Sequence, residues 1–261
     1  MPRLTHRRSR RAALAVVLAG ALAAIAPQGA AAQGGRDVKV AVAANFTEPA
    51  KEIAAVFAKS TGNKLILSFG ATGQFYAQIK QGAPFEVFLA ADKATPTKTV
   101  AEGLAVAGTQ ITYAVGKLVL YSTAPGLVAG EETLKSARFA KIAIANPATA
   151  PYGAAAVEVM KALGVHDALA SKIVQGQSIG QTYQFVRTGN AEVGFVALSQ
   201  IALVEGGSRW VVPGKLHQPI LQDAVLLKAG ESNPATREFL RFLAGKEAQA
   251  ITETFGYGLF N

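Results

Sequence analysis

Residues 38–59 read VKVAVAANFTEPAKEIAAVFAK, and this stretch sets the pattern that the rest of the chain repeats. Residues 38–43 form a short, valine-rich apolar run, which is typical of a buried strand. Ile53 and Phe57 follow at helical spacing, and Pro49 fits only the first turn of a helix. The stretch therefore predicts a strand, a polar turn and a helix that begins near residue 47 or 48.

The same alternation continues to the end of the chain. Further strands are expected at residues 65–69, 85–90, 111–122, 141–145, 173–174, 193–198 and 219–228. Further helices are expected at residues 74–81, 92–100, 153–163, 181–187, 235–243 and 247–254. Asp92 is interpreted as a helix cap rather than a catalytic acid, because caps are the commoner use of such a residue. Repeated strand–helix order predicts an α/β fold with parallel-rich sheets flanked by helices.

Two of these strands, at residues 111–122 and 219–228, are candidate crossings between two lobes. The chain would leave lobe one at the first crossing, build lobe two, and return at the second. This interpretation places residues 33–114 and 222–261 in lobe one and residues 115–221 in lobe two.

Residues 1–32 have the composition of a secretory signal peptide. Five arginines precede an apolar run at residues 12–26, which is shorter than the about 20 residues that a membrane span needs. The small residues at 30–32 predict cleavage after Ala32 and export to the periplasm. The triplet SRR at residues 9–11 resembles a twin-arginine signal, but Ala13 stands where such a signal has an aromatic residue, so the sequence leaves the export route open.

Composition excludes several classes of function. Removing the five N-terminal arginines lowers the formal net charge from +9 to +4, so nothing favours a nucleic-acid partner. The chain has no cysteine, and its three histidines, His6, His166 and His217, lie far apart in sequence. A disulfide framework, a cysteine zinc site and a thiol nucleophile are therefore excluded, and no metal site is expected. No P-loop or dinucleotide fingerprint is present, so no cofactor is expected either.

Four junctions between a strand and a helix share one character: they are small, polar or glycine-bearing and carry no charge. These are ANFT at 44–47, GATG at 70–73, APYG at 150–153 and QSIG at 177–180. In a parallel α/β sheet such junctions lie at the carboxyl ends of the strands, where ligands bind. Helix starts offer unpaired N–H groups, and Asn45, Thr72 and Tyr152 add side-chain donors. Two junctions from each lobe would surround an anion with donors.

One motif favours another class of protein. GQSIG at residues 176–180 matches the G-x-S-x-G pattern of a nucleophile elbow, which would make Ser178 the nucleophile of an exported serine hydrolase. Only His217 follows Ser178 as a base, and Glu192 or Glu205 would be the acid. Because no oxyanion segment precedes the motif, a binding protein rather than an enzyme is the favoured interpretation.

The ordered set of short segments resembles the periplasmic molybdate-binding proteins of ABC importers, from about residue 38 to residue 259. The segments that carry the resemblance are VAANF at 42–46, GATG at 70–73, GAPFEVF at 82–88, GKLVL at 116–120, NP at 146–147, APYG at 150–153 and GFVAL at 194–198. The resemblance implies a two-lobed type II periplasmic binding protein fold with the ligand in the cleft between the lobes. It implies that the ligand is molybdate or tungstate, with a receptor for sulfate or another tetrahedral oxyanion as the alternative.

The same resemblance implies a set of ligand-binding residues. The positions that match the family's motifs are Asn45, Thr72, Tyr152 and the backbone N–H of Ile179, with Ala44 and Gly73 as additional contributors. Many members have serines in the first two loops and some have a tyrosine at the place of Ala197, whereas this chain resembles the variety with asparagine first and tyrosine in APYG. The implied partner is an ABC importer permease in the inner membrane, and the implied state is a monomer.

Overall fold

Strand β1 (Asp37–Ala43) shows how the first of two sheets is built. It pairs in parallel with β2 (Lys64–Gly70) on one side and with β3 (Val87–Leu89) on the other. Its alternate side chains face opposite layers: Val38, Val40 and Val42 pack with helices on one face, and Ala41 packs with helices on the other. The run of small apolar residues is therefore a strand buried on both faces, as its composition predicts. The computed structural model describes residues 35–259.

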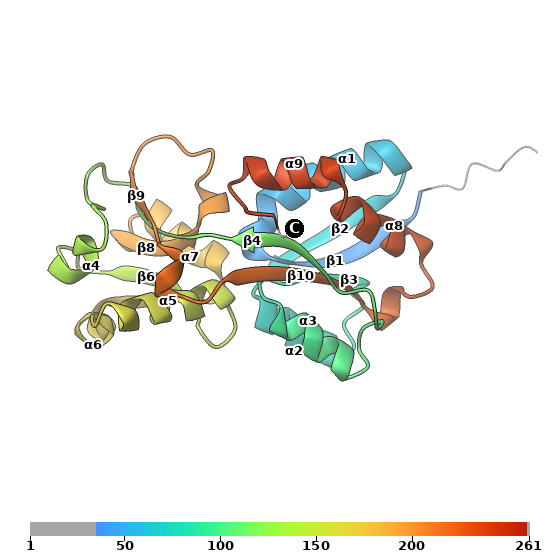
Figure 1. Ribbon diagram of the computed structural model, residues 1–261, viewed down its shortest axis with the longest axis horizontal. Helices are drawn as coiled ribbons and strands as arrows, with labels where there is room; N and C mark the ends of the chain where they lie inside the picture. The colour runs from blue at the N-terminus through green and yellow to red at the C-terminus, as the bar shows by residue number, and fades with distance from the viewer. Residues whose placement is uncertain (1–34, 260–261) are drawn as a thin grey trace, which may run out of the picture. The chain divides into compact units, whose positions relative to one another are not determined.

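Two further strands complete the first sheet, whose order is β2-β1-β3-β10-β4. Strand β10 (Ile220–Leu226) pairs antiparallel with both β3 and β4 (Ile111–Gly116). Figure 1 shows α1 (Thr47–Thr61), α8 (Pro234–Leu243) and α9 (Lys246–Thr254) on one face of this sheet. Helices α2 (Thr72–Lys80) and α3 (Ala94–Ala101) cover the opposite face.

The second sheet repeats this plan with the order β7-β6-β8-β5-β9. Its strands are β5 (Leu118–Ser122), β6 (Ile142–Ala145), β7 (Ile173–Gly176), β8 (Val193–Ala197) and β9 (Ser208–Val211). Helix α5 (Pro151–Ala162) packs on one face and α7 (Ile179–Arg187) on the other. The predicted α/β fold with two helix-flanked sheets is confirmed. Within residues 35–259, β10 in the first sheet and β5 in the second run opposite to the other strands of their sheet, and each follows a crossing.

The crossings lie close to the places that the sequence indicates. Strands β4 and β5 belong to different sheets and are separated by Lys117 alone, so the expected strand at residues 111–122 is two strands joined at one residue. The return crossing precedes β10, between residues 212 and 219, and contains the 3-10 turn η4 (Gly214–Leu216). The expected crossing strand at residues 219–228 thus lies in the first sheet, and the crossing itself is the segment before it.

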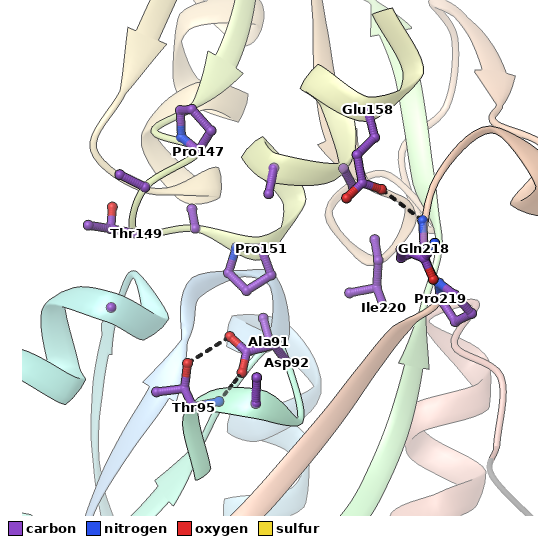
Figure 2. A pocket seen from close by; sticks show the side chains of 16 residues that line it. Ala91, Asp92, Thr95, Pro147, Thr149, Pro151, Glu158, Gln218, Pro219 and Ile220 are labelled. Atoms are coloured by element: carbon purple, nitrogen blue, oxygen red, sulfur yellow. Dashed lines mark hydrogen bonds between the residues drawn. The ribbon is translucent and has the colours of Figure 1, made fainter. Parts of the chain in front are cut away.

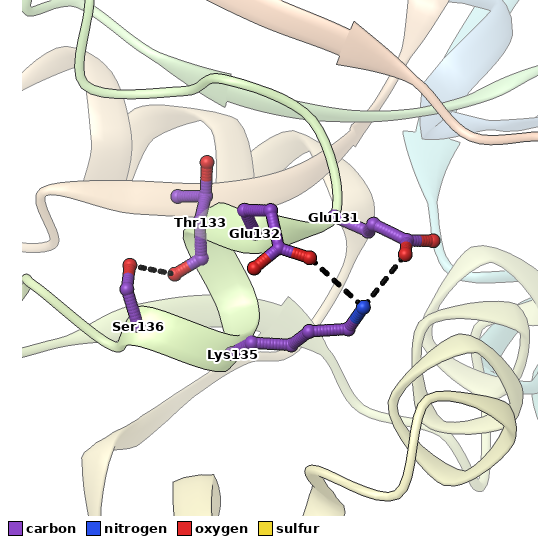
Figure 3. Close-up of polar contacts among 5 residues, drawn as sticks. All are labelled: Glu131, Glu132, Thr133, Lys135 and Ser136. Carbon is purple, nitrogen blue, oxygen red and sulfur yellow. Dashed lines mark hydrogen bonds and ion pairs between the residues drawn. The ribbon is translucent and has the colours of Figure 1, made fainter.

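Several short elements are not predicted from the sequence. Helix α4 (Glu132–Ser136) is too short to show a helical period, and its exposed Lys135 lies 2.7 Å from Glu131 and 2.9 Å from Glu132 (Figure 3). Such exposed pairs contribute little to stability. The other short elements are α6 (His166–Leu169) and the 3-10 turns η1 (Ala44–Phe46), η2 (Ala170–Lys172), η3 (Leu198–Gln200) and η5 (Lys228–Gly230).

None of the helices described between residues 35 and 259 has the length and apolar character to cross a membrane. The signal peptide expected at residues 1–32 lies outside the described residues.

A substitution at Phe57 tests how the helices α1 and α8 pack on the first sheet. Its ring is fully buried and meets the rings of Phe239 and Phe242 edge to face, at centroid distances of 5.5 and 5.4 Å. Phe57→Ala should lower the free energy of unfolding by about 3–5 kcal/mol, because it leaves a cavity between α1 and α8. Leu203→Ala, at a side chain that is 65% exposed, is the control and should change it by less than about 0.5 kcal/mol. Urea denaturation measures both, and equal effects would contradict this account of the core.

Candidate functional site

Four helices begin around one point between the two sheets. The turn η1 follows β1 and leads into α1, α2 begins at Thr72 after β2, α5 begins at Pro151 after β6, and α7 begins at Ile179 after β7. The sequence predicts the last three starts two residues later. The earlier starts matter because they place Thr72, Tyr152 and Ile179 in first turns, where backbone N–H groups have no partner within the helix.

These helix starts enclose a small cavity with a volume of about 10 Å³, which is room for about one water molecule. It is far smaller than the roughly 300–1,000 Å³ pockets that hold drug-sized ligands, so a ligand of several atoms needs the walls of the cavity to move apart. Its lining contains no charged side chain. The lining residues are Ala43, Ala44, Asn45, Gly70, Ala71, Thr72, Ala91, Ala150, Pro151, Tyr152 and Ile179.

Asn45, Thr72, Tyr152, Ile179 and Ala44, five of the residues that the sequence singles out, therefore line one cavity. Gly73 is placed elsewhere. Its N–H donates to the carbonyl oxygen of Thr149 at 2.8 Å, and a Cβ atom on Gly73 would lie 2.9 Å from the Cα of Thr149. The absence of a side chain at Gly73 thus lets the loop before α5 approach the start of α2.

Thr72 is a buried residue in the lining of the cavity. The residue is 1% exposed, and its Oγ1 accepts a hydrogen bond from the backbone N–H of Ala91 at 2.9 Å. A hydroxyl has one proton to donate and two lone pairs that accept. Because Ala91 occupies an acceptor position, the hydroxyl of Thr72 keeps its proton as a donor.

Tyr152, which belongs to the other lobe, also has a hydroxyl oxygen that accepts a hydrogen bond. Its hydroxyl oxygen accepts from Nε2 of Gln222 at 3.0 Å, and its ring is fully buried. Burial raises the pKa of the Tyr152 hydroxyl well above its ordinary value, so the group is a neutral donor. Tyr152 therefore contributes an uncharged hydroxyl.

The side chain of Asn45 bonds to other protein side chains. Its Nδ2 donates to Oε1 of Gln222 at 2.8 Å and to the hydroxyl of Tyr257 at 2.9 Å, so both amide hydrogens are engaged. The backbone carbonyl oxygen of Asn45 accepts from the hydroxyl of Ser199 at 2.7 Å. Asn45 therefore organises the first loop through its side chain, and what it offers a ligand comes chiefly from its backbone in η1.

Gln222, Tyr113, Tyr257 and Ser199 complete this buried network, and sequence analysis does not identify them. Gln222 and Asp223 are polar residues inside the otherwise apolar strand β10, which is the one signal that could have drawn attention to the first of them. The pairing of β10 with β4 shifts register between these two residues. A shift of this kind re-aims side chains and is frequent next to functional sites.

The two lobes touch beside the cavity. The bond from Ser199 to Asn45, the bond from Gly73 to Thr149 and the bond from Gln222 to Tyr152 each join a residue of the first sheet's layer to one of the second. The structure is therefore a closed arrangement, in which the cavity is bounded by both lobes.

A larger pocket, whose lining residues are drawn in Figure 2, shares Ala91, Ala150 and Pro151 with the cavity. It contains two carboxylates, each with a partner: Asp92 accepts from the N–H of Thr95 at 2.6 Å, and Glu158 accepts from the N–H of Gln218 at 2.8 Å. Asp92 thus bonds the first turn of α3 (Ala94–Ala101), as expected, although the N-cap position of that helix is Lys93 rather than Asp92. Burial raises the pKa of Asp92. Two acids make this pocket unfavourable for an anion.

The residues of a serine hydrolase are not assembled. Ser178 caps α7 by accepting from the N–H of Gln181 at 3.3 Å, with an extended backbone (φ −145°, ψ 166°) rather than the strained turn of a nucleophile elbow. Nδ1 of His217 lies 2.7 Å from the carbonyl oxygen of Gln218, and Glu192 accepts from the N–H of Lys141 at 2.9 Å. Within residues 35–259 no hydrogen bond links Ser178 to His217.

The fold and this cavity define a class of protein. Residues 38–258 match the family described as bacterial extracellular solute-binding protein, and the chain belongs to that family. Its two sheets, flanked by helices and joined by two crossings, form the two-lobed type II fold of periplasmic binding proteins.

Particular relatives narrow the class. The chain is 54% identical over 250 residues to the molybdate-binding protein ModA of Azotobacter vinelandii, covering 94% of this chain and 97% of that protein. It is 53% identical to ModA of Rhodobacter capsulatus, with 94% of each chain covered. The solved structure of the Azotobacter vinelandii periplasmic molybdate-binding protein superposes with a TM-score of 0.83, at 40% identity, over 86% of this chain and 100% of that one. The sulfate-binding protein SubI of Mycobacterium tuberculosis, at 12% identity and a TM-score of 0.71 over 85% and 86% of the two chains, shows the fold alone.

The buried tyrosines predict how stability depends on pH. Burial raises the pKa of the hydroxyls of Tyr113, Tyr152 and Tyr257 above the ordinary value of about 10. Their stabilising effect is therefore complete below about pH 10 and is lost as the pH rises, since the unfolded chain releases these protons first. Tyr113→Phe removes one such group and should reduce the loss of unfolding free energy by at most about 1.4 kcal/mol per pH unit above pH 10. Urea titrations from pH 8 to 11 measure this, and identical pH profiles for the two proteins would contradict it.

Proposed function

We propose that this protein is a periplasmic receptor that captures molybdate, and tungstate in the same way, and delivers it to an ABC importer. The observation that carries the proposal is the small cavity bounded by both lobes and lined by neutral donors from four helix starts. The relatives from Azotobacter vinelandii and Rhodobacter capsulatus are molybdate-binding proteins, which supports molybdate as the anion. A dedicated cofactor has no part in this function.

The cavity can hold a dianion without a countercharge. Thr72 and Tyr152 supply hydroxyl protons, and Ile179, Asn45 and Ala44 supply backbone groups at helix starts. Hydrogen bonds to a charged group contribute about 1.5–3 kcal/mol each, so several together offset the water that the anion loses. The positive ends of the helix dipoles at α2, α5 and α7 add to this attraction.

We expect the cavity to discriminate between anions because, in the part of the chain that the structure describes, no carboxylate in its lining can accept a proton from a protonated anion. Molybdate, tungstate and sulfate carry no proton at neutral pH, whereas phosphate retains at least one. Within the described residues no carboxylate lines the cavity, and Asp92 in the neighbouring pocket is bonded to Thr95. The phosphate proton would be buried without an acceptor, which is costly. We therefore expect phosphate to be rejected.

A receptor for sulfate is the second candidate, because a cavity of uncharged donors suits any fully deprotonated tetrahedral anion. Size separates the two, since sulfate is the smaller anion and would leave donors too far from its oxygens. Calorimetric titration with molybdate, tungstate, sulfate and phosphate ranks the four. Sulfate binding more tightly than molybdate would replace the first proposal with the second.

Closure is part of the proposed mechanism. We assign residues 33–114 and 222–261 to lobe one and residues 115–221 to lobe two, so that Asn45 and Thr72 approach the anion from one side and Tyr152 and Ile179 from the other. An anion that bonds both lobes favours the closed state by its differential affinity. The closed receptor, a monomer in this proposal, is what the permease in the inner membrane recognises.

Removing one hydroxyl at a time tests the site. Thr72→Val and Tyr152→Phe should each raise the dissociation constant for molybdate about ten-fold or more, because each removes one hydrogen bond to a charged partner. Ile179→Val is the matched control and should bind as the wild type does, since only its N–H faces the anion. Calorimetry measures the constants. Unchanged binding by Tyr152→Phe, or phosphate binding as tight as that of molybdate, would refute this picture of the site.

Export has its own test. The arginine cluster, the short apolar run and the alanines at 30–32 predict cleavage after Ala32. Mass spectrometry of the protein recovered from the periplasm should therefore show a chain that starts at Gln33. Recovery of the full-length chain in the membrane fraction would count against a cleaved signal.

A further inference from the structure

Gln222 makes three hydrogen bonds at the crossing between the lobes, although it does not line the cavity. It lies in β10 with 0% of its surface exposed. Its Oε1 accepts from Nδ2 of Asn45 at 2.8 Å and from the hydroxyl of Tyr113 at 3.1 Å, and its Nε2 donates to the hydroxyl of Tyr152 at 3.0 Å. The side chain thus connects the first loop to the one tyrosine that lines the cavity.

We propose that Gln222 is a positioning residue that directs the hydroxyl proton of Tyr152 toward the anion. The proposal rests on the proposed function, since it concerns how one donor of that site is prepared before the anion arrives.

The orientation of the Gln222 amide is set by its neighbours. A carboxamide accepts at one end and donates at the other. Asn45 presents an N–H to the Oε1 end, and the hydroxyl of Tyr113 shares its one proton between this oxygen and the carbonyl oxygen of Ala90. Turning the amide over would place its N–H groups against the N–H group of Asn45, so the donor end stays at Tyr152.

This orientation decides what the Tyr152 hydroxyl can do. The phenol has a single proton, and its oxygen already accepts from Gln222. The proton cannot be donated back to a group that is itself a donor. The hydroxyl oxygen of Tyr257 accepts from Asn45 and keeps a second lone pair, to which Tyr152 can donate while the cavity holds no anion. An anion that enters the cavity is charged and therefore a stronger acceptor than this phenol oxygen, so the Tyr152 proton turns to the anion.

Gly116 gives an independent sign that this contact is built into the crossing. A Cβ atom on Gly116 would lie 2.1 Å from the hydroxyl oxygen of Tyr152 and 2.6 Å from Nε2 of Gln222. Gly116 is the last residue of β4, directly before the chain enters the second sheet. A side chain there would separate the two polar atoms, so the glycine is required for their approach rather than for an unusual backbone angle.

A double-mutant cycle tests the proposal. Gln222→Met keeps the length of the side chain but removes the amide, and it should raise the dissociation constant for molybdate about five- to ten-fold. In a Tyr152→Phe background the same change should alter the constant by less than about two-fold, because the hydroxyl that Gln222 acts on is gone. In a Thr72→Val background, which Gln222 does not contact, its full effect should return. Calorimetry gives the constants, and thermal melting confirms that each variant is folded.

Gln222→Glu is a second variant with the same shape, in case the first does not fold. Its carboxylate accepts where Nε2 donates, so it would draw the Tyr152 proton away from the anion. We expect a larger loss of affinity than with Gln222→Met. Adding Tyr152→Phe to Gln222→Glu should then cause no further loss, because the hydroxyl has already been diverted.

The outcomes separate this inference from the proposed function. If the wild-type protein does not bind molybdate, the proposed function fails and this inference fails with it. If it binds, but Gln222→Met weakens binding equally with and without the Tyr152 hydroxyl, then Gln222 has only a structural role and this inference alone is overturned. A loss confined to chains that retain the Tyr152 hydroxyl supports it.

Discussion

The proposed site depends on hydrogen bonds in which a hydroxyl oxygen accepts from a neighbouring N–H group, so that the hydroxyl proton stays available for donation. Ala91 does this for Thr72, and Gln222 does it for Tyr152. In the proposed site, each group is then satisfied from the protein side and keeps its proton for the anion. A buried polar group without any partner would be costly, whereas one with a single free proton is ready for an anion. The rest of the fold serves to bring two such groups together from different sheets.

Local patterns in the sequence predict the elements and most of the cavity's lining. Strand β1 and helix α1 follow from residues 38–59 alone, and Thr72, Tyr152 and Ile179 stand where a strand passes into a helix. The helix starts are misplaced by two residues because Gly73, Gly153 and Gly180 read as loop. Gln222 and Tyr257 escape prediction for another reason: their bonds to Asn45 span 177 and 212 positions, and no local pattern records such a contact.

The two reversed strands explain how one chain builds two similar sheets. Strands β5 and β10 are the first strands after each crossing, and each pairs antiparallel with the sheet it enters. The carboxyl ends of β1, β2, β6 and β7 consequently meet the same cavity from two sides. This places helix starts of both lobes around a ligand, an arrangement that a single sheet cannot provide.

The single residue between β4 and β5 also constrains how such a chain can change during evolution. Surface loops accept added residues at little cost, because closing a longer loop adds only a small entropy. An added residue at Lys117 would instead turn β5 relative to β4 and move Gly116 away from Tyr152 and Gln222. The length of the chain is therefore fixed at this crossing, while loops such as the one around Gly126 and Gly130 are free to vary.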